Sequence, residues 1–160
     1  MKKLVIYYSL EGNTKIIAET IANEMGADTM ELKPKKEISK KGFSKYLWGG
    51  KQVIMKETPE LTLIDKDISE YDLLIIGTPV WGCNFAPPIR TLFSNKEIVN
   101  KTIALFCTHD GGPGKIINRM KEAILDNNFI SEMFFEKVSS NTDYNIKKAK
   151  KWAQDLEKNV

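Results

Sequence analysis

The chain has 160 residues, of which 42% are hydrophobic and 28% charged, with a formal net charge of +3. This length suits one domain, and this composition is typical of a soluble globular protein and excludes a disordered or fibrous chain. The apolar stretch near the N-terminus is too short for a signal-peptide core, and no run approaches the roughly 18 apolar residues of a membrane helix. We therefore expect no membrane association.

The two cysteines, Cys83 and Cys107, lie far apart in the sequence and belong to no C-x-x-C pair. Their spacing excludes a zinc ribbon, a thioredoxin-type site and a four-cysteine cluster. Two lone thiols favour a reducing, cytoplasmic setting. Two interpretations stay open: reduced side chains that act as small hydrophobic groups, or a redox disulfide between two loops.

The positive charge is concentrated in one segment. Eight lysines and one glutamate give Lys33–Lys56 a local charge of +7, so the other residues sum to −4. The next stretch, Glu57–Asp72, holds six acidic residues and one lysine. Such runs are typical of a solvated surface connection, and the aromatic residues among the lysines leave an anion-binding site as the alternative. Because the excess belongs to one segment and not to the whole fold, we expect no nucleic-acid partner.

Apolar runs and helical repeats alternate along the chain. The first half predicts, in order, a strand over Leu4–Tyr8, a helix over Asn13–Met25, a strand over Met30–Leu32 starting near Ala27, a possible short helix over Ser44–Trp48 and a strand over Asp72–Gly77. The second half predicts a helix from Pro87 to about Phe93, a strand over Thr102–Cys107, a helix over Pro113–Asn127, a strand over Phe129–Val138 and a helix from about Asp143.

Strands that alternate with helices imply right-handed crossovers and a parallel sheet with helices on both faces. The fold class is therefore α/β with five strands. The sequence holds no internal repeat and no second core, so we expect a single domain over residues 1–160.

Ligands bind open α/β sheets at the carboxyl ends of the strands, so the loops after the first, third and fourth strands are the candidate site. The first loop, Ser9–Thr14, leads directly into a helix. Gly12 can adopt positive φ, Ser9 and Thr14 offer hydroxyls, and the free N–H groups of the helix start would complete a phosphate cradle without a cation. An ordinary helix N-cap with a turn glycine is the alternative. A Walker-type loop and a G-x-G-x-x-G fingerprint are both absent from this position.

The other two loops suit a flat ligand. Thr78–Phe85 combines a proline, a glycine and Trp81 next to backbone amides, and a core role for Trp81 is not expected in such a loop. Thr108–Gly114 is rich in glycine, which allows close approach of the backbone. We expect the three loops to form one concave site with few charges.

These loops resemble those of the flavodoxin family. Ser9–Thr14 resembles the phosphate loop of flavodoxins, and Gly77–Trp81 resembles the second flavin loop of flavodoxin-like proteins and their quinone-reductase relatives. With Thr108–Gly112, the match covers most of the chain in order and spacing. The resemblance implies a flavodoxin-like fold of the short-chain type, with strand order 2-1-3-4-5 and FMN at the carboxyl ends of the strands.

The resemblance also assigns residues to three parts of FMN. It implies that the phosphate is bound by Ser9, Gly12, Asn13 and Thr14. Flavodoxins usually have Thr or Ser where this chain has Glu11, and because phosphate repels a carboxylate we predict that Glu11 binds through its backbone N–H while its side chain turns to solvent. It implies that the isoalloxazine is lined by Thr78, Pro79, Val80, Trp81, Gly82 and Asn84, with Trp81 against a ring face. It implies that the pyrimidine edge is bonded by Thr108, His109, Asp110, Gly111 and Gly112.

Three residues keep two interpretations each. His109 is the only histidine and has an ordinary pKa near neutrality; it is either an exposed loop residue or a donor to flavin N1/O2 or to a substrate. Asp110 either accepts from flavin N3–H or starts an Asp-Gly turn. Trp48 either anchors the lysine-rich segment or covers the flavin.

Three functions are compatible with these residues. The resemblance favours electron transfer between soluble redox proteins in the cytoplasm. The alternative is an NAD(P)H-dependent FMN reductase that acts on quinone-like acceptors, with His109 or Tyr46 as the substrate-side donor. A cofactor-free interaction module on the same fold is disfavoured because all three loops are intact. No oligomeric state follows from the sequence.

Overall fold

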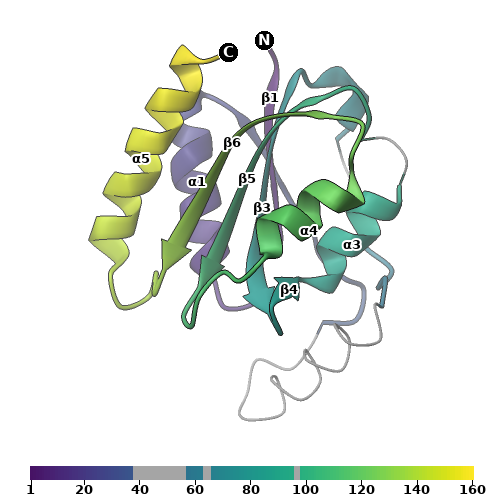
Figure 1. Cartoon of the computed structure of the whole chain (residues 1–160), viewed down its shortest axis with the longest axis horizontal. Coiled ribbons are helices and arrows are strands. Elements are labelled where there is room, and N and C mark those ends of the chain that lie inside the picture. The colour runs from purple at the N-terminus through teal and green to yellow at the C-terminus, as the bar shows by residue number, and fades with distance from the viewer. Residues whose placement is uncertain (38–56, 63–65, 96–97) are drawn as a thin grey trace.

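A central sheet with helices on both faces organises the chain (Figure 1). The computed structural model describes residues 1–37, 57–62, 66–95 and 98–160. The elements in these ranges are β1 (Lys3–Tyr7), α1 (Asn13–Met25), β2 (Asp28–Glu31), the 3-10 turn η1 (Ile68–Glu70), β3 (Leu73–Trp81), β4 (Asn84–Phe85), α3 (Pro87–Ser94), β5 (Thr102–His109), α4 (Ile116–Ala123), β6 (Asn128–Glu136) and α5 (Thr142–Lys158).

Five strands run parallel in the order β2-β1-β3-β5-β6. Apart from the inserted β4, this is the predicted order 2-1-3-4-5, and the predicted α/β fold class is confirmed. β4 pairs antiparallel with the end of β3. It is missing from the predicted elements because a strand of two residues has no periodicity to detect. The short helix predicted over Ser44–Trp48 lies outside the described residues.

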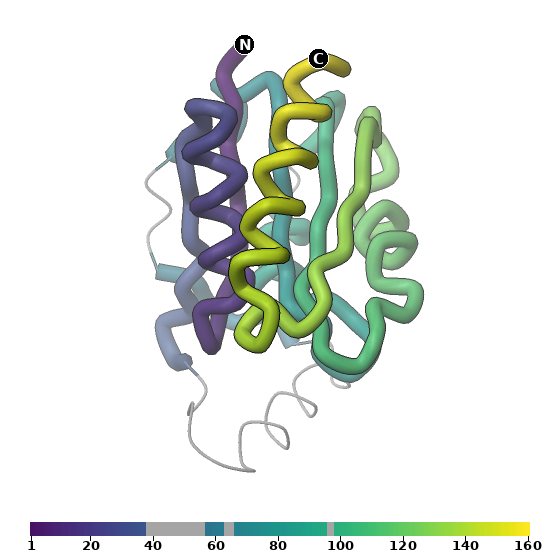
Figure 2. Tube along the Cα trace, turned by 90° about the vertical axis from the view of Figure 1, so that its left-hand side faces the viewer, coloured from purple at the N-terminus to yellow at the C-terminus, as the bar shows by residue number. Residues whose placement is uncertain are grey.

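Side chains alternate between the two faces along each central strand. In β1, Leu4 and Ile6 point into the core beneath α3 and α4, whereas Val5 and Tyr7 point into the core beneath α1 and α5. Figure 2 shows α1 and α5 side by side on their face of the sheet. Because both faces are covered, the strands are apolar on both sides, which explains the continuous apolar runs in the sequence.

The largest differences from the predicted bounds concern β3 and α4, while most other strand ends differ by one or two residues. β3 continues to Trp81 and does not end at Gly77, because its pairing with β5 extends to Pro79 opposite Thr108 and its last residues then pair with β4. α4 covers only Ile116–Ala123 of the predicted Pro113–Asn127. Gly114 has φ 56 and Ile124 has φ −140, so neither residue is helical. The extension of β3 places residues expected in a loop on a paired strand.

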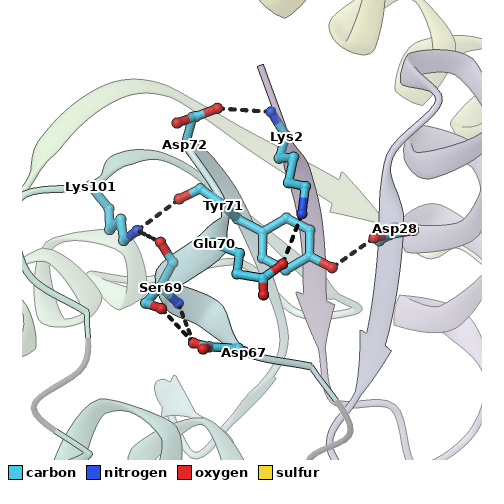
Figure 3. A network of polar contacts seen from close by, with 8 residues as sticks. All are labelled: Lys2, Asp28, Asp67, Ser69, Glu70, Tyr71, Asp72 and Lys101. Atoms are coloured by element: carbon cyan, nitrogen blue, oxygen red, sulfur yellow. Dashed lines mark hydrogen bonds and ion pairs between the residues drawn. The ribbon is translucent and has the colours of Figure 1, made fainter.

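The carboxyl ends of the parallel strands meet at one edge of the sheet, the lower edge in Figure 1, and both termini lie at the opposite edge. Polar contacts join the strand starts at that opposite edge (Figure 3). The backbone N–H of Lys2 donates to Asp72 at 2.8 Å, and the Tyr71 hydroxyl donates to Asp28 at 2.6 Å. The Lys101 ammonium donates to the Tyr71 carbonyl at 2.8 Å. None of the helices in the described ranges is long and apolar enough to span a bilayer.

Candidate functional site

A pocket of about 270 Å³ lies at the carboxyl ends of β1, β3 and β5. Its volume is near the lower end of the roughly 300–1,000 Å³ typical of small-molecule sites. The three predicted segments converge on it. The predicted residues that line it are Ser9, Glu11, Asn13, Thr14, Pro79, Val80, Trp81, Thr108, His109, Asp110 and Gly111.

The first loop ends in a helix N-terminus without a side-chain cap. Gly12 occupies the N-cap of α1 with φ 97, and its N–H donates to Ser9 Oγ at 3.1 Å. The first backbone bond of the helix runs from the Ile16 N–H to the Gly12 carbonyl at 3.0 Å. The N–H groups of Asn13, Thr14 and the next residue therefore lack acceptors within the helix. A loop that leaves these donors uncapped suits an anion better than the alternative of an ordinary N-cap.

Two threonines join the first loop to β5. The Oγ1 atoms of Thr14 and Thr108 lie 2.8 Å apart, although the residues are 94 positions apart in the sequence. Their exposed fractions are 1% and 4%. Both nevertheless line the pocket, so this buried hydrogen bond lies at its wall.

Trp81 forms one wall of the pocket at the end of β3. Its ring packs edge-to-face on Tyr8, with ring centroids 5.5 Å apart, and it also contacts the core beneath α3 and α4. The expectation of no core role is therefore wrong in part, because the longer β3 anchors Trp81 to the sheet. The buried Tyr8 hydroxyl donates to Glu37 at 2.9 Å. Burial, together with the Glu37 carboxylate, raises the pKa of Tyr8, which keeps this hydroxyl neutral.

His109 lines the pocket in a half-buried position at the end of β5. Its Nδ1 accepts from the Gly112 N–H at 3.1 Å, so the proton of the neutral ring is assigned to Nε2. Burial lowers the pKa of His109, Glu136 and Asp110 act in the opposite direction, and Lys148 lowers it further. The imidazole is therefore neutral near pH 7 and has one N–H donor available.

Five predicted site residues do not line the pocket: Gly12, Thr78, Gly82, Asn84 and Gly112. Thr78 is fully buried, and its hydroxyl accepts from the Ala86 N–H at 3.0 Å and donates to the Pro79 carbonyl at 2.9 Å. Gly82 lies in the turn between β3 and β4, with φ 54. Gly12, Gly82 and Gly112 have no side chain, and the side-chain oxygen of Asn84 accepts from the Phe85 N–H at 2.9 Å.

Leu10 and Val138 also line the pocket, and neither is among the predicted site residues. Leu10 lies within the first loop, where an apolar residue between polar ones is the only signal. Val138 follows β6, which is held beside β5 by a hydrogen bond from the Lys137 N–H to the His109 carbonyl at 2.8 Å. No sequence pattern relates Val138 to the loops, because their proximity depends on strand order.

Among the described residues that line the pocket, none has a lysine or arginine side chain. The titratable ones are Glu11, His109 and Asp110, and both acidic residues are exposed. An anion in the pocket would therefore be held by backbone N–H groups and hydroxyls, as expected from the sequence. Within the described part of the chain, no group of three His, Cys, Asp or Glu side chains is arranged to hold a metal ion.

Both cysteines are free thiols, Cys83 exposed and Cys107 buried, so the disulfide alternative is not realised. Burial raises the pKa of Cys107 to about 12, which leaves its thiol protonated. Cys83 lies in the turn between β3 and β4, and its carbonyl accepts from Arg119 Nη1 of α4 at 2.7 Å. This contact fixes the turn to α4.

The start of the lysine-rich segment pairs with the acidic stretch that follows it. Pro34 and Leu61 form an antiparallel bridge, and the Lys35 N–H donates to the Glu60 carbonyl at 2.8 Å. The Lys35 and Glu60 side chains also form an ion pair. These contacts are compatible with a surface connection. Residues 38–56, which include Tyr46 and Trp48, lie outside the described ranges, so the predictions for these two residues stay predictions.

Comparisons with known proteins agree on one family. A family model described as Flavodoxin matches residues 2–155. A flavoprotein from Lactobacillus acidophilus NCFM, crystallised in complex with FMN, is 29% identical with a TM-score of 0.73, and the match covers 89% of this chain and 97% of that one. No curated protein matches the sequence.

Two more distant structures agree in fold. A protein from Bacteroides eggerthii DSM 20697 is 22% identical with a TM-score of 0.77, and the match covers 98% of each chain. Oxidised Flavodoxin 2 from Bacillus cereus is 15% identical with a TM-score of 0.65, and the match covers both chains completely. At these identities the likeness concerns the fold alone.

Proposed function

Since the chain belongs to the flavodoxin family, we propose that its pocket binds FMN non-covalently and that the protein transfers electrons between soluble partners. Bound FMN supplies one- or two-electron chemistry, while the protein binds and orients it and limits its contact with water. The observation that carries the proposal is the uncapped start of α1, which opens into a pocket walled by Trp81. The FMN complex of the Lactobacillus acidophilus flavoprotein supports the choice of ligand.

The residues present fit the two ends of FMN. The N–H groups at the start of α1 and the hydroxyls of Ser9 and Thr14 suit a phosphate monoester, which accepts hydrogen bonds without needing a cation. Glu11 lines the pocket and is exposed, and we expect its carboxylate to turn to solvent, away from the phosphate.

The pocket also has an apolar lining that suits an aromatic ring system. It consists of Trp81, Val80 and the two additional residues Leu10 and Val138. The neutral His109 offers its Nε2–H to an acceptor such as flavin N1 or O2. Asp110 remains the proposed acceptor for flavin N3–H.

Partners and location follow from the same proposal. We expect soluble redox proteins or small quinone-like acceptors, and two free thiols support a cytoplasmic setting. The neutral donor at His109 keeps a second function open, an NAD(P)H-dependent FMN reductase in which His109 donates on the substrate side.

The binding test uses purified apoprotein with FMN and riboflavin, followed by flavin absorbance and fluorescence. We expect FMN to bind with a changed spectrum, and Trp81→Ala to weaken FMN binding and alter the spectrum because it removes one pocket wall. Trp152→Phe is the control, since Trp152 is a buried residue of α5 that faces the core beneath α1 and α5 and does not line the pocket. Apoprotein that takes up no FMN would contradict the proposal, and unchanged binding by Trp81→Ala would remove Trp81 from the site.

The second test separates electron carrier from reductase. We expect anaerobic titration of the FMN-loaded protein with dithionite to reduce it, while NADH and NADPH leave its absorbance unchanged on the same timescale. Steady oxidation of NAD(P)H with a quinone acceptor, at protein concentrations far below substrate, would instead favour the reductase.

A further inference from the structure

A buried pair of threonines, Thr14 and Thr108, joins the start of α1 to the end of β5 at the pocket. Thr14 lies in the first turn of α1, and Thr108 precedes the last residue of β5. Their Oγ1 atoms are 2.8 Å apart, and either oxygen can be the donor. The side-chain hydroxyl of Thr108 is hydrogen-bonded to Thr14, although the resemblance assigns Thr108 to the pyrimidine edge of the flavin. The geometry therefore relates the Thr108 hydroxyl to the phosphate end of the pocket.

The direction of this hydrogen bond determines what Thr14 offers to a ligand. A hydroxyl has one proton and two lone pairs. If Thr108 donates to Thr14, the Thr14 proton is free to point into the pocket. If Thr14 donates to Thr108, the Thr14 oxygen presents only lone pairs to the pocket.

A phosphate dianion can only accept hydrogen bonds, so the Thr14 hydroxyl can bind it only in the first arrangement. The N–H groups at the start of α1 are donors too, and a Thr14 proton adds one more donor to the same cluster. Both side chains are almost fully buried, so bulk water competes little for the Thr108 hydroxyl. Thr108 is thereby suited to fix the direction of the Thr14 hydroxyl before the ligand arrives.

We propose that Thr108 is a positioning residue which, by donating to Thr14, turns the Thr14 hydroxyl toward the ligand phosphate and favours FMN over riboflavin. This inference rests on the proposed FMN function. Thr108 acts through Thr14 and does not itself contact the phosphate. Its contribution therefore depends on the presence of both hydroxyls and on a phosphate in the ligand.

The test compares Thr108→Val with Thr108→Ser, using dissociation constants for FMN and riboflavin. Valine has nearly the shape of threonine but has no hydroxyl, whereas serine keeps the hydroxyl. We expect Thr108→Val to weaken FMN binding about 3- to 10-fold, the range of one lost hydrogen bond, and to leave riboflavin binding unchanged. Thr108→Ser should bind FMN like the unchanged protein. Thr102→Val is the control, because Thr102 lies at the other end of β5.

A double-mutant cycle tests whether the effect passes through Thr14. Once Thr14→Val has removed the recipient hydroxyl, adding Thr108→Val should cause no further loss of FMN affinity. Additive losses would overturn the inference, as would equal losses for FMN and riboflavin or no loss for either. Urea unfolding of each apoprotein verifies folding. If the unchanged protein binds neither flavin, the proposed function itself fails and this inference fails with it.

Discussion

What a side chain in the pocket can offer to a ligand depends on its own hydrogen-bond partners as well as on its residue type. His109 illustrates this, because its Nδ1 is occupied by the Gly112 N–H and its pKa is lowered by burial. Protonation would place a hydrogen on Nδ1 and break that bond. The third loop and the protonation state of His109 are therefore coupled.

We predict that NMR titration of the single histidine gives a pKa below 6.5, its ordinary value. Because the unfolded chain then binds the proton more readily, the contribution of His109 to stability is complete above about pH 6.5. It is lost as the pH falls toward the lowered pKa. The free energy of unfolding relative to His109→Gln should therefore be greater near pH 7.5 than near pH 5. A measured pKa at or above 6.5 would contradict the prediction.

Among the elements, β3 does most to shape the site. Its pairing with β5 extends beyond Gly77, so Pro79, Val80 and Trp81 reach the pocket on a paired strand. Gly77 itself lies against the ring of Phe106 on β5, and a methyl group at Gly77 would overlap that ring. The position of the Phe106 ring over Gly77 therefore requires glycine there.

We predict that Gly77→Ala lowers the free energy of unfolding by about 1–3 kcal/mol or more, as expected for overpacking. Phe106 cannot move aside easily, because it is fully buried and packs edge-to-face on Phe135 and Trp152. Gly111→Ala is the matched control: nothing lies within 4 Å of an added Cβ there, so we expect a change within about 0.5 kcal/mol. Urea unfolding measures both, and equal stability of the two variants would refute this account of Gly77.

At the scale of the whole molecule, the net charge of +3 says little about the ligand site. Part of the lysine-rich segment is paired with acidic residues: Lys35 with Glu60, and Lys33 with Glu31 at 3.5 Å. Such exposed pairs contribute only about 0–1 kcal/mol each. No lysine or arginine is among the described residues that line the pocket, so the proposed anion recognition relies on backbone N–H groups and hydroxyls at the sheet edge.

Because FMN is expected to bind only the folded chain, it should stabilise the whole molecule. At a free concentration of 100 times its Kd, we predict about 2.7 kcal/mol of added stability. For a chain of this length this corresponds to a rise in Tm of about 5–10 °C. Thermal unfolding followed by circular dichroism measures it. Riboflavin at the same concentration should raise Tm less, and an unchanged Tm in the presence of saturating FMN would contradict a single native-state site.

The sequence by itself determined the α/β class, the five parallel strands and the chemistry of the three loops, because apolar periodicity, glycines and hydroxyls act locally. Tertiary structure decided which of these residues meet. Trp81 reaches both core and pocket through the extension of β3, and Val138 enters the site through the position of β6 beside β5. The Thr14–Thr108 hydrogen bond depends on strand order and on the position of α1 over the sheet. A contact between residues so far apart in the chain leaves no local sequence pattern. The sequence could therefore suggest Thr14 and Thr108 as site residues, but it could not predict that they bond to each other.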